Sequence, residues 1–186
     1  MVGRNRTLPA LVVALCVAAV AVGCSESTPA ATESPVPTAP NSSSKQVVRE
    51  RSNVSLTSTY SDLSTVGPSN QRVVGWNRLE GRSTFLGVPV AVKLLGAVEY
   101  TRGSGPFDGY VSFTAADGSQ LVMYLDGQAT GEQESTDLFG RLEFVGATGR
   151  WRGAVAAGEF RGTRANRVGA PIAATFALVV DPRAGL

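Results

Sequence analysis

The sequence contains no histidine, and its 186 residues include only two cysteines. The absence of histidine excludes Ser-His-Asp and Cys-His catalysis, and it excludes zinc sites built on imidazole. Cys16 and Cys24 both lie near the N-terminus, so the rest of the chain has neither a thiol nor a disulfide. A folded domain in that part must be stable from packing alone, even in an oxidising compartment. Redox and thiolate chemistry are excluded from it as well.

Charge is also scarce, because only 17% of the residues are Asp, Glu, Lys or Arg, where about 25% is usual. The formal net charge of +2 depends on Arg4 and Arg6, and the rest of the chain has 15 basic and 15 acidic residues. A neutral domain has no electrostatic attraction for a phosphate backbone, so we expect no nucleic-acid partner. We also expect no metal and no other cofactor.

Residues 1–23 have the layout of a secretory signal peptide, with a positive start, an apolar run and small residues at the end. Arg4 and Arg6 provide the positive charge, and residues 8–22 are apolar apart from Pro9 and small side chains. This run of about 15 residues is shorter than the roughly 20 that cross a membrane. The segment therefore indicates export rather than a membrane-spanning helix.

The residues Ala21-Val22-Gly23-Cys24 resemble the bacterial lipobox, with Ala21 in the place where leucine is preferred. The resemblance implies that a diacylglycerol is joined to the Cys24 thiol and that residues 1–23 are cut off. Two or three acyl chains hold a protein firmly on a bilayer. We therefore expect a lipoprotein anchored on the outer face of the cell membrane. An ordinary signal peptide with an incidental cysteine and an uncleaved N-terminal anchor are the alternatives.

Residues 24–45 predict a disordered tether. Almost all of them are Ser, Thr, Pro, Ala or Glu, and prolines occupy positions 29, 35, 37 and 40. Such a composition buries too little apolar surface to offset the entropy of ordering, and proline keeps the chain extended. We therefore expect a spacer between the lipid and a single domain at residues 46–186.

The domain shows eight segments in which polar and apolar residues alternate, which is the periodicity of a half-buried strand. They are residues 54–60, 72–79, 88–100, 107–114, 121–125, 138–145, 154–161 and 172–180. Asp117-Gly118 is the clearest hairpin turn between them, for which both residues must accept a positive φ. The spacing predicts an all-β fold, a small antiparallel β-barrel of about eight strands, with a β-sandwich as the alternative.

The segment 145–154, which reads VGATGRWRGA and is followed by Gly158, resembles a glycine-rich motif of the allene oxide cyclase-like and dirigent-like β-barrels. The resemblance implies a barrel and gives the motif a structural role, as a tight turn between late strands. It transfers no catalytic residue. The same glycines could form a dinucleotide-binding turn, but that turn needs a helix after it. Alternation and further glycine follow instead, so we reject that interpretation.

Catalysis without histidine or cysteine would need carboxylate, tyrosine, arginine or lysine side chains. Glu99, Glu143 and Glu159 lie in predicted strands, where a barrel could point them inward and raise their pKa for general acid or base work. We favour the simpler interpretation that all three face solvent. We expect the large rings of Trp76 and Trp151 to plug the ends of the barrel.

Our leading hypothesis is a non-catalytic, membrane-anchored protein that binds a small apolar or amphipathic ligand or a protein partner of the cell envelope. A barrel of about eight strands either holds one small ligand or fills with side chains. The small residues at 154–158 and 170–177 would leave room inside. Two alternatives stay open. One is a cyclase or isomerase that uses a Glu and a Tyr inside the barrel, and the other is a structural envelope protein with a solid barrel.

Overall fold

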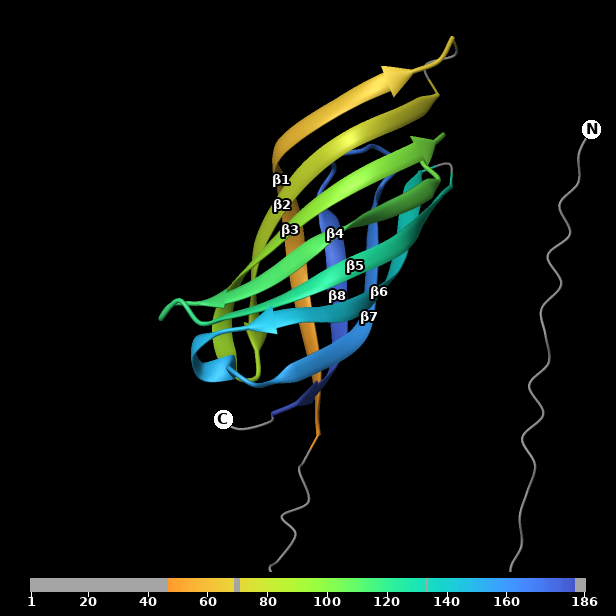
Figure 1. Ribbon diagram of the computed structural model, residues 1–186. Helices are drawn as coiled ribbons and strands as arrows, with labels where there is room; N and C mark the ends of the chain where they lie inside the picture. Colours follow the sequence, from red (N-terminus) through yellow and green to blue (C-terminus); the bar gives the residue numbers. More distant parts are fainter. Residues whose placement is uncertain (1–46, 69–70, 133, 183–186) are drawn as a thin grey trace, which may run out of the picture. The chain divides into compact units, whose positions relative to one another are not determined.

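The computed structural model describes residues 47–68, 71–132 and 134–182. In these residues eight strands form a closed antiparallel barrel, in which each strand pairs with the next and the last pairs with the first (Figure 1). The strands are β1 (Val48–Val66), β2 (Arg72–Phe85), β3 (Val88–Thr101), β4 (Gly105–Ala115), β5 (Gln120–Gly131), β6 (Ser135–Ala147), β7 (Val155–Ala165) and β8 (Ile172–Asp181). The predicted signal peptide, Cys24 and the predicted tether lie outside the described residues.

The closed barrel confirms the predicted all-β fold and decides between the barrel and the sandwich. Every neighbouring pair of strands is antiparallel. The one helical segment of the described part is η1 (Gly149–Trp151), a single 3₁₀ turn between β6 and β7. Across the residues that the structure describes, no helix has the length and hydropathy to cross a membrane.

The two-residue alternation of each strand separates the core from the surface. In β4, Phe107, Val111 and Phe113 are buried, whereas Tyr110 between them is half exposed on the outer face. Successive side chains of a strand point to opposite faces, so one face of each strand must be apolar to close a core. The apolar positions of the predicted segments therefore form the interior of the barrel.

Aromatic rings fill the middle of that interior. Phe85, Phe113, Phe176 and Phe160 contact one another in series, with ring centres 5.2, 5.3 and 5.3 Å apart. Glycines on the inner face make room for these rings. A Cβ atom on Gly162 would lie only 3.1 Å from the ring of Phe160. Of the small residues at 154–158 and 170–177, only Ala170 borders an internal cavity, so most of the expected room is already occupied.

The hairpin turns follow two geometries. Leu86-Gly87 joins β2 to β3 with both residues at positive φ, 48° and 74°, which matches the right-handed twist of the strands. The predicted hairpin at Asp117-Gly118 is present, but only Gly118 has a positive φ. The Gly118 N–H donates to the Ala115 carbonyl at 3.0 Å. The turn therefore begins one residue earlier than a two-residue hairpin centred on Asp117-Gly118 would. The expectation of two positive φ angles was therefore wrong for Asp117.

The two ends of the barrel differ. At the end where β1 begins and β8 finishes, Trp151 of η1 is fully buried and packs edge-on against Phe85, with ring centres 5.2 Å apart. We call this the plugged end. The opposite end, where β3 and β7 finish and β8 begins, contains the internal cavity and is called the cavity end.

Candidate functional site

A small cavity lies inside the barrel at the cavity end. Its volume is about 40 Å³, which corresponds to roughly three water molecules. Its lining combines apolar side chains with three polar ones, and consists of Asn77, Leu79, Leu94, Gly96, Ala97, Val98, Tyr100, Phe107, Leu138, Phe160, Arg164, Val168, Gly169, Ala170 and Ile172. Among these residues only Arg164 carries a charge.

Strand geometry explains why Tyr100 and Arg164 face this cavity. In β7, Phe160 and Gly162 are buried on the inner face, and Arg164 follows at the same two-residue interval. In β3, Leu94 and Tyr100 likewise belong to the buried inner set. Because alternate residues of a strand share a face, both polar side chains are carried into the interior near the ends of their strands.

Arg164 is buried, and among the residues that the structure describes no acidic side chain forms an ion pair with it. Only 5% of its surface is exposed, and its Nη1 donates a hydrogen bond to the Ala165 carbonyl at 3.0 Å. Its guanidinium carbon lies 5.6 Å from the centre of the Tyr100 ring, within the range of a cation–π contact. Its Nη2 atom is buried and has no hydrogen-bond partner among the described residues. Arginine stays protonated in proteins, so this end of the barrel contains a buried positive charge. Its neighbours are the Tyr100 side chain, which also forms a hydrogen bond with it, and the Ala165 carbonyl, and neither is a counter-ion.

Burial shifts the pKa of both groups, in opposite directions. The pKa of Tyr100 is raised from 10.0 to about 12, because burial disfavours the phenolate more than the nearby Arg164 charge favours it. Burial lowers the pKa of Arg164, and the Tyr100 side chain opposes that shift. Tyr100 is therefore a neutral phenol at neutral pH, and it does not serve as a counter-ion for the guanidinium.

Asn77 provides the third polar group of the lining. Its side chain is buried, and its Oδ1 accepts a hydrogen bond from the Ser58 hydroxyl at 2.6 Å. This bond joins β1 to β2 at the level of the cavity. The polar lining therefore combines the Arg164 guanidinium, which only donates hydrogen bonds, with the Asn77 amide and the Tyr100 hydroxyl, which both donate and accept. The guanidinium gives this lining its preference for an anionic ligand group.

A larger hollow of about 1130 Å³ lies on the outer surface over β5, β6, β7 and β8. All of its charged residues are exposed, with basic Arg49 and Arg141 beside acidic Asp126, Glu143 and Glu159. Exposed charges of both signs are screened by water and contribute little to binding. The internal cavity, with its buried charge, is therefore the stronger candidate for a site.

The three glutamates considered for catalysis all face solvent, as the simpler interpretation predicted. Glu99 forms an ion pair with Arg72 on the outer surface. Glu159 forms one with Arg161 at 3.4 Å, and Glu143 is also exposed. None of the three lines the cavity. The described lining of the cavity therefore contains no carboxylate, and its one phenol, Tyr100, has a raised pKa.

The two tryptophans have different positions. Trp151 plugs one end of the barrel, as predicted, and its indole nitrogen has no hydrogen-bond partner among the described residues. Trp76 was also expected to plug an end, and that prediction was wrong, because its side chain is 56% exposed. Neighbouring Asn77 takes the inward position of β2, so Trp76 points to the outer face.

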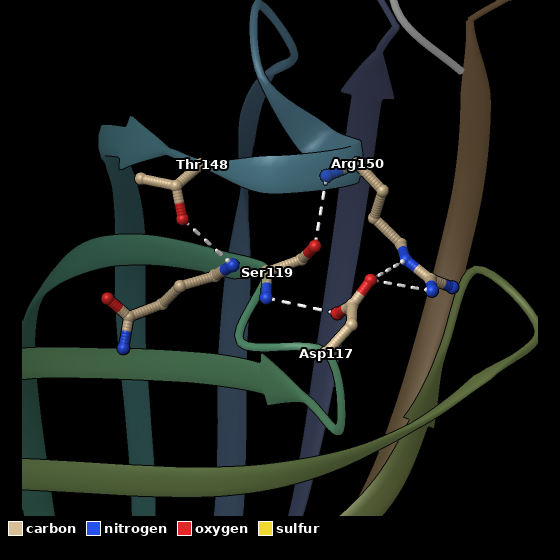
Figure 2. Close-up of polar contacts among 5 residues, drawn as sticks. Asp117, Ser119, Thr148 and Arg150 are labelled. Carbon is tan, nitrogen blue, oxygen red and sulfur yellow. Dashed lines mark hydrogen bonds and ion pairs between the residues drawn. The ribbon is translucent and has the colours of Figure 1, made fainter.

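The glycine-rich segment after β6 is structural at the plugged end (Figure 2). Ser119 anchors it, because the Ser119 hydroxyl accepts the Arg150 N–H at 2.9 Å. The Asp117 carboxylate accepts bonds from the Ser119 N–H and from the Arg150 guanidinium, which lower its pKa, the Ser119 bond contributing most. These contacts clamp the β4–β5 turn to η1. A strand follows η1, in place of the helix that a dinucleotide site would need.

Sequence reasoning missed Tyr100 and Arg164 as site residues, although the alternation of their strands places each side chain on the inner face. Extending the alternation of residues 154–161 by two further periods, from Phe160 through Gly162, places Arg164 on the inner face. The predicted strand stopped at Arg161, whereas β7 continues to Ala165. Tyr100 closed a predicted strand, but nothing in the sequence indicated that an arginine would lie over its ring.

Comparison with known proteins assigns the chain to no family. No protein-family model matches this chain, and no curated protein sequence matches it either. The function of the cavity is therefore inferred from its own residues.

Proposed function

We propose that this chain is an exported, lipid-anchored and non-catalytic binding protein whose barrel end takes the anionic group of a small amphipathic ligand. The observation that carries the proposal is the buried guanidinium of Arg164. One of its nitrogens has no partner, and no carboxylate lies beside it in the described part of the chain.

A buried charge without a counter-ion is costly for a fold. Moving a charge from water into a protein interior costs several kcal/mol. A protein with an apolar residue at such a position is often more stable than one with the charge. The guanidinium is also planar and binds a carboxylate through two parallel hydrogen bonds. A ligand carboxylate at Arg164 would supply the missing counter-ion and a partner for Nη2.

The walls of the cavity favour an apolar remainder for that ligand. Leu79, Leu94, Phe107, Leu138 and Ile172 surround the polar groups. The volume of about 40 Å³ accommodates a carboxylate with one or two carbons, far below the roughly 300 Å³ or more of a drug-sized pocket. A longer apolar tail would have to continue out of the cavity end. A short or medium-chain carboxylic acid fits these limits best.

Export and anchoring are supported by residues 1–24. The charged start, the short apolar run and the small residues before Cys24 are those of a lipoprotein signal. We propose that acyl chains on Cys24 hold the barrel on the outer face of the cell membrane. A ligand in the surrounding medium or in the membrane surface would then be within reach.

The hypothesis of a cyclase or isomerase is weaker than the binding proposal. It requires a carboxylate inside the barrel, whereas Glu99, Glu143 and Glu159 are on the outer surface. The presence of Arg164 also argues against the hypothesis of a structural envelope protein with a solid barrel, because a purely structural interior gains no stability from an unpaired charge. Ligand binding accounts for both observations.

Titration with hexanoate and hexanol tests the binding proposal. The two ligands share a tail and differ in charge, so a binding site built on Arg164 should take hexanoate and not hexanol. Arg164→Met should weaken hexanoate binding at least about tenfold, since a charged hydrogen bond contributes about 1.5–3 kcal/mol. Arg161→Met on the outer face of the same strand is the matched control and should bind normally. Equal binding of the two ligands, or equal affinity of the two variants, would refute the proposal.

Membrane fractionation of a Cys24→Ala variant tests the anchor. The unaltered chain should be found in the membrane fraction with the added mass of its acyl chains, and the variant should be released. A variant that stays in the membrane fraction with an unchanged mass would show that the lipid is not on Cys24.

A further inference from the structure

The inner face of the hairpin formed by β1 and β2 continues beyond the cavity. The pairing of β1 with β8 ends at Leu56 opposite Ile172, and residues 57–66 of β1 pair with β2 alone. In Figure 1 the end of β1, at its arrowhead, borders β2 and no other strand of the described chain. At the cavity end, the hairpin therefore extends past the point where β8 closes the barrel wall.

A β-bulge in β1 decides which side chains lie on the inner face of this hairpin. The register of β1 and β2 shifts between Ser58 and Tyr60. Beyond the shift, Leu63 lies opposite Gly75, and Gly75 lies opposite Val98, which lines the cavity. An extra residue in one strand exchanges its inward and outward positions. The bulge therefore places Leu63 on the inner face, in the same row as a side chain of the cavity.

Leu63 and Val73 form an apolar strip on this face, which we call the hairpin strip. Val73 lies directly opposite Tyr100, which lines the cavity. Both side chains of the strip are half-buried, and neither belongs to the hydrophobic core of the described residues or to the lining of the cavity. Gly75 has no side chain, so it leaves Leu63 open toward Val98. The apolar surface of the cavity is therefore continuous with the strip.

The hairpin strip begins beside the polar group of the proposed ligand site. The guanidinium carbon of Arg164 lies 5.6 Å from the centre of the Tyr100 ring, and Val73 is the cross-strand neighbour of Tyr100. A carboxylate bound at Arg164 would therefore have the strip beside it. The cavity of about 40 Å³ has no room for more than a short tail. A partly exposed apolar strip next to an anion site has the chemistry to take the rest of an alkyl tail out of water.

The spacing of the strands sets the length of that tail. Tyr100 lies on β3 and Leu63 on β1, so two strand spacings, together about 10 Å, separate the two ends of the path. A zigzag of carbon–carbon bonds of about 1.5 Å needs roughly eight carbons to cover this distance. Further carbons would pass the edge of β1 and enter water. The strip therefore favours one length of tail over shorter ones.

We propose that Leu63 and Val73 hold the alkyl tail of an unbranched carboxylic acid of about eight carbons, whose carboxylate lies at Arg164. This inference rests on the proposed function, because the strip serves a tail only when the anionic group is bound at Arg164. It adds a preference for chain length, which the cavity alone would not give.

Titration with butanoate, hexanoate, octanoate and decanoate tests the preference. Every sample carries Cys24→Ala, so that no acyl chain or detergent competes with the added acid. Affinity should rise up to about fourfold for each added carbon as far as octanoate, because a buried methylene contributes about 0.8 kcal/mol. Decanoate should then bind no more than about twofold tighter than octanoate. Equal affinities for butanoate and octanoate would overturn the proposal.

Val73→Ser and Val74→Ser form a matched pair of variants. The two valines are adjacent in β2 and both half-buried, but they lie on opposite faces of the strand. Val73→Ser should weaken octanoate binding at least about fivefold and leave butanoate binding unchanged, and Leu63→Ser should do the same from β1. Val74→Ser should bind both acids as the chain without it does. Equal octanoate affinities of Val73→Ser and Val74→Ser would contradict a tail on the inner face.

The same titrations distinguish a failure of the hairpin strip from a failure of the site at Arg164. Binding of butanoate that is lost in Arg164→Met, with no gain in affinity at octanoate, would refute the strip and leave the proposed function standing. No binding of any of the four acids would refute both.

Methyl NMR gives a second readout that needs no substitution in the hairpin. The methyl signals of Leu63 and Val73 should shift on addition of octanoate but not of butanoate, whereas those of Val74 should shift with neither acid. Shifts of the same size at Val73 and Val74, or no shift at Leu63 with octanoate, would contradict the proposed path of the tail.

Discussion

The guanidinium carbon of Arg164 lies 5.6 Å from the centre of the Tyr100 ring, inside a cavity from which carboxylates are absent in the described chain. The contact gives the cation a favourable neighbour but does not neutralise it. A fold selected for stability alone would place an apolar residue here. In the proposed function, the anionic group of a ligand would supply the counter-ion that Arg164 lacks.

Replacing Arg164 with methionine should leave the free energy of unfolding unchanged or raise it by about 1–3 kcal/mol. Methionine has a similar length and removes the buried charge, and exchanging buried charges for apolar groups is often stabilising. Chemical denaturation of Arg164→Met beside the unaltered chain measures the change. A loss of stability would show that the guanidinium is part of the structural core, and the argument for a binding role would fail.

Tyr100 should make stability fall at high pH. Its pKa is raised from 10.0 to about 12, so the unfolded chain loses this proton first. The contribution is fully present below pH 10 and is lost as the pH rises from 10 to 12. A shift of two units corresponds to about 3 kcal/mol at most. Chemical denaturation across that pH range should show that the free energy of unfolding falls more steeply for the unaltered chain than for Tyr100→Phe. The same pH dependence for both proteins would contradict a buried phenol at Tyr100.

Trp151 should be essential for the plugged end, whereas Trp76 should be dispensable for stability. Removing a fully buried ring leaves a cavity, and Trp151→Ala should lower the free energy of unfolding by about 3–5 kcal/mol. Trp76→Ala removes an exposed ring and should change it by less than about 0.5 kcal/mol. Thermal or chemical unfolding of the two variants makes the comparison. Similar losses for both would mean that η1 does not close the barrel.

Gly149 should tolerate alanine less well than Gly118, although both have a positive φ. A Cβ atom on Gly118 meets no atom within 4 Å, so Gly118→Ala should cost only the strain of the backbone, about 1 kcal/mol. A Cβ on Gly149 would lie 2.2 Å from the Ser119 Oγ, which anchors Arg150. The Gly149→Ala protein should therefore lose clearly more stability in denaturant. Equal losses would show that the clamp between Ser119 and η1 is loose.

The barrel could be predicted from the sequence because the two-residue period of its strands is a local property. Phe107, Val111 and Phe113 fall on one face by counting alone. Closure into a barrel rather than a sandwich depends on the pairing of β1 with β8, which the local pattern does not contain. The geometry of the turns was harder to predict from the sequence. Asp117-Gly118 was recognised from its residue types, whereas Leu86-Gly87 was not, because leucine rarely adopts the positive φ that it has there.

The candidate site could not be predicted, because it depends on pairs of residues that only closure of the barrel brings together. Arg164 and Tyr100 are far apart in the sequence and meet where β7 and β3 end at the same side of the barrel. The glutamates in the middle of strands were the more conspicuous candidates, and they face solvent. The useful signal was a polar residue, Arg164, that continues the inward positions of Phe160 and Gly162 beyond the predicted strand.

Native mass spectrometry of the chain purified from its own host tests the central claim most directly. The account predicts a retained small organic acid on the unaltered protein and its absence from Arg164→Met, with Arg161→Met retaining it. Identical spectra for the unaltered chain and Arg164→Met, either both empty or both carrying the same adduct, would contradict a ligand site at Arg164.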